Sequence, residues 1–166
     1  VSLVGTFDYG LPNCPPGYYH SHIILRKEDP REKISDLRGT KFAYNSLDSE
    51  SGYCCVQRLF DNLKKYCSGL IKTGAHQNSI MKVLEGSADF AAIDAVTWRY
   101  FEKSHASISS QLKIIISTNP VPALPLITSK KRLLTEIVEA VELAIDTSSE
   151  IKNVLQINKF VKIPHE

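Results

Sequence analysis

Residues 41–53, KFAYNSLDSESGY, join an apolar run to a polar loop and the start of a helix. The run 41–44 has the composition of a buried strand. After it, apolar residues recur at helical spacing and predict a helix over 52–66. Ser49 or Ser51 is the expected N-cap, because a serine oxygen can accept a free backbone N–H of the first turn. The stretch therefore predicts a strand–loop–helix unit with a polar loop at the end of the strand.

The same alternation continues along the chain and predicts an α/β protein with a mixed, mostly parallel sheet. The run 88–95, ADFAAIDA, is apolar throughout, which is typical of a strand covered on both faces. Ligands usually bind where such strands end and helices begin. Three polar clusters lie at those points, namely 45–51, 73–79 and 94–97. The predicted strands are 2–7, 20–27, 40–45, 68–74, 88–95, 112–118 and one within 122–129, and the further helices are 76–85, 95–103, 130–146 and a shorter one within 148–163.

Composition narrows the class of function. The chain has 166 residues, 43% of them hydrophobic, and a net charge of +2. That length suits one domain with a real core, and the balanced charge gives no electrostatic case for nucleic acid as a partner. No apolar run approaches the ~18 residues that a membrane-spanning helix needs, and the first ten residues lack the pattern of a signal peptide.

The sequence contains no recognisable catalytic set, cofactor motif or metal-ligand spacing. The four cysteines, Cys14, Cys54, Cys55 and Cys67, fit no metal motif, because adjacent Cys54 and Cys55 point to different sides of a helix. We expect buried or half-buried thiols, with a bridge from Cys54 or Cys55 to Cys67 as the alternative. We therefore expect no catalytic residues, no cofactor and no metal, and a protein that is not an enzyme.

Three segments resemble one protein family in order and spacing. They are DLRGTKFAYNSLDSESGY (36–53), KTGAHQNSIMKVLEGSADFAAIDAVTW (72–98) and PVPALPLIT (120–128). Together they are similar to the substrate-binding proteins of phosphonate-type ABC transporters, within the type 2 periplasmic binding protein superfamily. The agreement covers about residues 1–146 and includes individual glycine, histidine and aspartate positions.

The resemblance implies a two-lobed fold that closes over a ligand. Residues 1–166 then form one substrate-binding region, in which about 28–118 are the complete lobe. Residues 1–27 and 119–166 are crossover strands and a remnant of the other lobe, whose N-terminal part is missing. One lobe alone is expected to bind weakly, because a cleft needs two walls.

The resemblance also implies which residues contact a small anionic or zwitterionic ligand. The loop of Ser49, Glu50, Ser51, Gly52 and Tyr53 opens a helix, where backbone N–H groups and hydroxyls can surround an oxyanion. Glu50 departs from the family's usual neutral residue, and its carboxylate opposes an anion unless it turns outward or meets a cation. The other expected contacts are Tyr9, His76, Ser79 and Asp94, whereas His20 and His22 are expected on a partly exposed face.

The expected function is ligand capture for an ABC transporter, with a phosphonate or phosphate ester as the ligand. The expected partner is an ABC permease, together with a second copy or the missing lobe. The resemblance implies the periplasm or a lipid anchor as the location, and the four cysteines without a clear pairing leave the cytoplasm as the alternative. Two alternatives remain. One is a sensory or interaction domain that reuses the lobe. The other is an enzyme similar to the thiamine-pyrimidine synthases, suggested by Cys54, Cys55 and His76.

Overall fold

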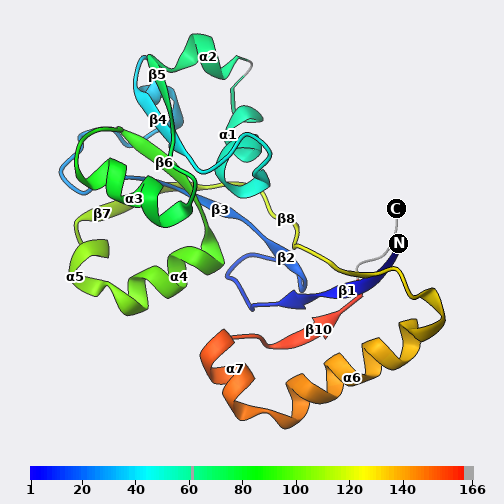
Figure 1. Ribbon diagram of the computed structural model, residues 1–166. Coiled ribbons are helices and arrows are strands. Elements are labelled where there is room, and N and C mark those ends of the chain that lie inside the picture. Colours follow the sequence, from blue (N-terminus) through cyan, green and yellow to red (C-terminus); the bar gives the residue numbers. More distant parts are fainter. Residues whose placement is uncertain (61, 163–166) are drawn as a thin grey trace. The chain divides into compact units, whose positions relative to one another are not determined.

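The computed structural model describes residues 1–60 and 62–162 (Figure 1). The chain divides into two compact units, the first formed by Val1–Tyr19 and Pro120–Glu166 and the second by His20–Asn119. The chain therefore leaves the first unit after Tyr19 and re-enters it at Pro120. The strand at 21–26, which the resemblance assigns to a crossover, lies in the sheet of the second unit.

The second unit is built on a mixed five-stranded sheet. Strand β4 (Lys41–Tyr44) runs parallel to β5 (Gly69–Lys72) and β6 (Phe90–Asp94), whereas β3 (Ser21–Arg26) runs antiparallel to β6 and to β7 (Leu112–Ser117). The strand order is β5-β4-β6-β3-β7. The predicted mixed sheet is confirmed, although only the half that contains β4, β5 and β6 is parallel. Strand β6 lies at the centre of the sheet and is buried on both faces, which explains its unbroken apolar sequence.

Helices cover both faces of this sheet. One face packs against a π-helical turn (Glu50–Cys54), α1 (Cys55–Gln57) and α2 (Leu63–Tyr66), with Phe42 and Phe90 stacked at its centre. The opposite face packs against α3 (His76–Leu84) and α4 (Ala95–Ser104), and α5 (Ala106–Ser109) follows α4 along the chain. A short 3₁₀ turn (Ile34–Leu37) precedes β4. The α/β layering predicted from the sequence is thus present in the second unit.

The predicted single helix over 52–66 is wrong. The segment begins with the π-helical turn, continues as one turn of α1 and restarts as α2. The restart has a local cause, because the side-chain oxygen of Asn62 accepts the backbone N–H of Lys65 at 3.1 Å and so caps a new helix. The Phe60 ring stacks on Tyr66 with centroids 3.8 Å apart. Apolar spacing alone does not reveal that the helix breaks between these two rings.

The start of β4 is anchored by an ionic network. Asp89 accepts the backbone N–H of Lys41 at 2.8 Å and a guanidinium N–H of Arg31 at 2.9 Å. Arg31 also pairs with buried Asp29. Burial raises the pKa of Asp89, but the hydrogen bonds from Arg31 and Lys41 outweigh burial, so the pKa is lowered. This network fixes the register of β4 and hence the position of the loop that follows it.

The first unit has a smaller, antiparallel sheet. Strand β1 (Ser2–Asp8) lies between β10 (Lys159–Val161) and β9 (Leu126–Thr128), and β2 (Tyr18–Tyr19) pairs with β8 (Val121–Pro122). A 3₁₀ turn (Lys131–Leu133) leads into α6 (Leu134–Thr147), and α7 (Ser149–Leu155) follows. The core contains Val4, Val138, Ile145, Ile157 and Phe160. The predicted helix over 130–146 is confirmed in its α6 part, but the strand β10 was not predicted.

The described part of the chain contains neither a helix that could span a membrane nor a cluster that could bind a metal. No helix among residues 1–60 and 62–162 has both the length and the apolar character needed to cross a bilayer. Within the same residues, no three or more histidine, cysteine, aspartate or glutamate side chains are grouped so that they could hold a metal ion.

Candidate functional site

The polar loop after β4 is shaped by hydrogen bonds to Ser49. Its hydroxyl accepts the backbone N–H of Gly52 at 3.1 Å, so Ser49 is the N-cap. Its carbonyl accepts the N–H groups of Tyr53 and Cys54, each at 3.0 Å. The five-residue spacing of the bond from Cys54 makes the turn π-helical, a geometry that is frequent at functional sites. The loop thus presents its next side chains, Glu50 and Ser51, from a fixed backbone.

Ser51 and His76 meet across the ends of two strands. Ser51 follows β4 and His76 begins α3 after β5, and the Ser51 Oγ lies 2.9 Å from His76 Nε2. Burial lowers the pKa of His76, although the charge of Asp94 and the Ala92 backbone raise it in part. The other ring nitrogen, Nδ1, is buried and has no hydrogen-bond partner among the described residues. The structure therefore brings together two of the residues singled out in the sequence.

Asp94 adds a carboxylate to this cluster. Its Oδ1 accepts the backbone N–H of Thr97 at 2.8 Å, so Asp94 is the N-cap of α4. Its charge also acts on His20, where burial lowers the pKa and Asp94 raises it in part. His20 is 6% exposed, so the expectation of a partly exposed ring is wrong for this residue. The pairing of Ser21 with Asp94 in the β3–β6 ladder is what carries His20 to this position.

The Glu50 side chain is paired with a cation. Its carboxylate forms an ion pair with Arg58, and the Arg58 Nη1 donates to Glu50 Oε2 at 3.2 Å. The expected conflict between this carboxylate and an anionic ligand is thereby reduced, because the pair has no net charge. Arg58 was not singled out in the sequence. Arg58 lies two helical turns after Glu50, so in one continuous helix the two side chains would share a face. Because the helix is broken, the sequence alone does not show which face each residue occupies.

Three other expected contacts are buried. Tyr53 is 8% exposed and packs in an aromatic cluster, with its ring centroid 4.9 Å from Tyr44. Ser79 is fully buried, and its hydroxyl lies 2.7 Å from Thr73 Oγ1. Gly52 is buried against the Asn45 side chain, where an added Cβ would lie 2.0 Å from Oδ1. All three residues are buried in this structure, and their direct contact with a ligand stays a prediction.

Tyr9 belongs to the first unit. It follows β1, and its ring packs edge-on against Phe7 with centroids 6.5 Å apart. Ser49, Glu50, Ser51, Gly52, Tyr53, His76, Ser79 and Asp94 all belong to the second unit. The role of Tyr9 in ligand contact stays a prediction.

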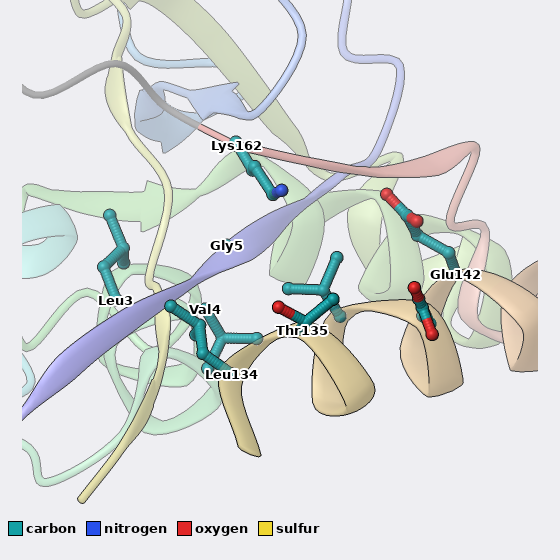
Figure 2. Close-up of a pocket in the computed structure, with 9 residues that line it drawn as sticks. Leu3, Val4, Gly5, Leu134, Thr135, Glu142 and Lys162 are labelled. Carbon is teal, nitrogen blue, oxygen red and sulfur yellow. The ribbon is translucent and has the colours of Figure 1, made fainter. Parts of the chain in front are cut away.

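The first unit has a cavity of its own (Figure 2). It has a volume of about 410 Å³ and lies between β1 and α6. Leu3, Val4, Leu134 and Val138 contribute apolar side chains, and Glu139, Glu142 and Lys162 contribute charged ones. Among the described residues, its lining contains no histidine, cysteine or aspartate. The side chains expected to bind an oxyanion lie elsewhere.

The cysteines are all free thiols, as expected. Burial raises the pKa of Cys55 to about 11, and its thiol donates to the Ser51 carbonyl at 3.0 Å. A thiol with so high a pKa is protonated near neutral pH and is a poor nucleophile. Cys55 therefore gives no support to the enzyme alternative, and its contact helps to hold Ser51 in place.

Comparisons with known proteins give one consistent result. PhnD1 from Prochlorococcus marinus, in complex with methylphosphonate, is similar in structure, with a TM-score of 0.77 and 16% identity over 97% of this chain and 65% of that one. A Xanthomonas citri protein bound to ATP has a TM-score of 0.73 and 16% identity over 98% of this chain and 65% of that one. A binding protein component of an ABC phosphonate transporter from Pseudomonas aeruginosa has a TM-score of 0.68 and 18% identity over 94% and 54%. No curated protein sequence matches.

At these identities the solved structures establish the fold alone, and this chain spans at most 65% of the length of the three described. The sequence profile described as "ABC transporter, phosphonate, periplasmic substrate-binding protein" matches residues 10–163, which is most of the chain. The resemblance read from residues 36–53, 72–98 and 120–128 is thus confirmed, and the chain belongs to the family of periplasmic substrate-binding proteins of phosphonate ABC transporters.

Proposed function

We propose that this chain is the ligand-capturing part of a phosphonate transport receptor and that its second unit binds a small oxyanion at Ser51 and His76. The observation that carries the proposal is the 2.9 Å contact between Ser51 Oγ and His76 Nε2 at the ends of β4 and β5. The Ser51 hydroxyl can donate to an oxyanion, and the His76 imidazole beside it can supply a balancing positive charge. Family membership supports the same ligand class.

The carboxylates around the pair are already engaged and so leave room for a small anion. Glu50 is matched by Arg58, and Asp94 is engaged as a helix cap. Among the described residues, no carboxylate is hydrogen-bonded to the side chain of Ser51 or His76. An oxyanion therefore meets the Ser51 hydroxyl and the His76 ring, and the carboxylate whose charge acts on that ring is Asp94, which suits a ligand amine if the ligand is zwitterionic.

The experiment is a titration of the full chain with methylphosphonate, inorganic phosphate and methanesulfonate, followed by calorimetry and thermal shift. We expect millimolar to micromolar binding of at least the phosphonate, and a rise in Tm that grows with ligand concentration. His76→Gln should weaken binding by about 1–3 kcal/mol, the scale of one charge-assisted hydrogen bond. Asp94→Asn should weaken it as well, because the charge of Asp94 raises the pKa of His76. The asparagine keeps the helix-cap oxygen, so the fold is retained.

The matched control is Ser87→Ala, an exposed serine on the same unit. It should bind all three compounds as the wild type does. Absence of binding by every compound at millimolar concentration contradicts the proposal, and wild-type affinity in both site variants removes His76 and Asp94 from the site.

The transport partners follow from the same proposal. An ABC permease in the inner membrane receives the ligand, and the periplasm is the compartment in which capture occurs. A single lobe offers one wall of a cleft, so affinity should rise when the polypeptide corresponding to the uncovered part of the longer neighbours, or a second copy, is supplied. Co-expression of that segment followed by calorimetry measures the gain.

A further inference from the structure

The Ser51–His76 hydrogen bond has a direction that depends on the protonation of the ring. A hydroxyl has one proton to donate, and a histidine with both nitrogens protonated has no acceptor. An unprotonated Nε2 therefore takes the only proton of Ser51, at the observed 2.9 Å. A protonated Nε2 donates to Oγ instead and leaves the hydroxyl proton free to turn toward another acceptor.

The surroundings of His76 favour the neutral ring in the free protein. Burial lowers its pKa, and the charge of Asp94 and the Ala92 backbone compensate only in part. His20 is the second imidazole near Asp94, and burial lowers its pKa as well. The His20 ring lies against that of His22, whose pKa burial lowers to about 4.

Among the described residues, the charge that acts on the His76 ring is the negative one of Asp94. Glu50 is occupied by Arg58 on the loop side, and Cys55 is a protonated thiol that bonds to the Ser51 carbonyl. On α3 itself, the Ser79 hydroxyl bonds to Thr73. The free site thus holds one carboxylate, Asp94, facing neutral rings, and an anion that enters adds a second negative charge. Uptake of a proton by the ring offsets that charge.

We propose that the neutral His76 ring of the free protein carries its proton on Nδ1 and accepts from Ser51, that an oxyanion binds with uptake of one proton from solvent at Nε2, and that this proton reverses the Ser51–His76 hydrogen bond so that the Ser51 hydroxyl donates to the ligand. This inference rests on the proposed function and adds its pH dependence. In atom terms, a solvent proton bonds to Nε2 and Nε2–H donates to Oγ, while the hydroxyl proton stays bonded to Oγ and turns from Nε2 toward a ligand oxygen. Asp94 is the internal counter-charge of the imidazolium.

The sign of the pH dependence follows. The bound anion raises the pKa of His76 above its free value, so binding consumes a proton at any pH between the two values. Affinity is full below the free pKa and is lost as pH rises through the bound pKa, by up to about tenfold per pH unit for one coupled proton. Capture is therefore tighter in mildly acidic surroundings.

The experiment measures the proton directly. Full-length chain is titrated with methylphosphonate by calorimetry in Hepes and in Tris at about pH 7.5, above the ordinary histidine value, and the difference in heat gives the number of protons taken up. Methylphosphonate can itself take a proton near neutral pH, so methanesulfonate, whose charge is constant, is the matched ligand. With methanesulfonate we expect uptake of up to about one proton, no uptake in His76→Gln, and unchanged uptake in His105→Gln, which lies at the end of α4; with methylphosphonate the uptake also includes the ligand's own protonation change.

Nitrogen NMR of the histidine rings in the wild-type complex with methylphosphonate reads the same event without a variant. We expect His76 alone to become doubly protonated on binding. Ser51→Ala should still take up the proton but bind more weakly, and equal affinity in that variant overturns the reversal of the hydrogen bond. Binding with a neutral His76 ring overturns this inference and leaves the proposed function standing, whereas absence of binding overturns both.

Discussion

Gly52 carries the sharpest structural prediction, because its backbone lies against the side chain of Asn45. An added Cβ would lie 2.0 Å from Oδ1 and 2.7 Å from Cγ of Asn45, which is closer than atoms can approach. The change Gly52→Ala must therefore push the amide away. Asn45 Oδ1 now accepts the backbone N–H of Ser46 at 2.9 Å, and that bond is lost when the amide moves.

The magnitude has three parts. The lost hydrogen bond costs about 0.5–1.5 kcal/mol, and crowding in a packed site costs about 1–3 kcal/mol. Alanine recovers about 0.5–1 kcal/mol relative to glycine in a helical turn. The net loss in the free energy of unfolding is about 0.5–4 kcal/mol, and each kcal/mol lowers Tm by about 2–4 °C for a chain of this size.

Urea denaturation and thermal melting of Gly52→Ala measure this loss. Gly69→Ala is the matched control, because a Cβ there lies 3.4 Å from Lys41 Cγ, an ordinary contact, and the variant should be neutral or slightly more stable. The double variant with Asn45→Ala removes the clash, so its loss should be smaller than the sum of the two single losses. A Gly52→Ala protein as stable as the wild type, or additive losses in the double variant, refutes the packing of Gly52 on Asn45.

Three further predictions follow from the ion pairs and the thiol. Arg58→Met leaves Glu50 unpaired, so methylphosphonate should bind about 2- to 5-fold more weakly, the scale of an exposed charge pair; calorimetry should show recovery in high salt and on adding Glu50→Gln, and unchanged affinity excludes the pair from the site. Cys55 has a pKa raised to about 11 by burial, so its reaction with a disulfide reagent should be slow near pH 8 and accelerate as the pH approaches 11, whereas a fast folded-state reaction near pH 8 contradicts the burial. Asp89→Asn removes a carboxylate whose pKa is lowered by Arg31 and the Lys41 backbone against the effect of burial. The stabilisation by this carboxylate is present above its unfolded pKa of about 3.9 and is lost as the pH falls through its folded pKa. Wild type and variant should therefore differ most in urea stability at neutral pH and converge below about pH 4.

Local signals in the sequence determined most of the elements. Apolar residues at period two or in unbroken runs identified β4, β6 and β7, because a strand's side chains alternate between faces or are all buried. Helical spacing identified α3, α4 and α6 for the corresponding reason. The same spacing failed over 52–66, since the cap on Asn62 and the stacking of Phe60 on Tyr66 depend on contacts that periodicity does not encode.

Some features of the candidate site also follow from the sequence, and others follow only from the tertiary structure. The sequence by itself identified Ser51, His76 and Asp94 as polar residues at strand ends, and family resemblance gave them a common ligand. Only the tertiary structure decided that Ser51 bonds to His76, that Arg58 balances Glu50, and that His20 is buried beside Asp94. The physical reason is that these pairs join residues from separate strands and turns, whose distances are set by the order β5-β4-β6-β3 and by the break in the helix after the loop. Local sequence patterns determine which side chains are available to the site, and the pairing of strands determines which of these side chains come into contact.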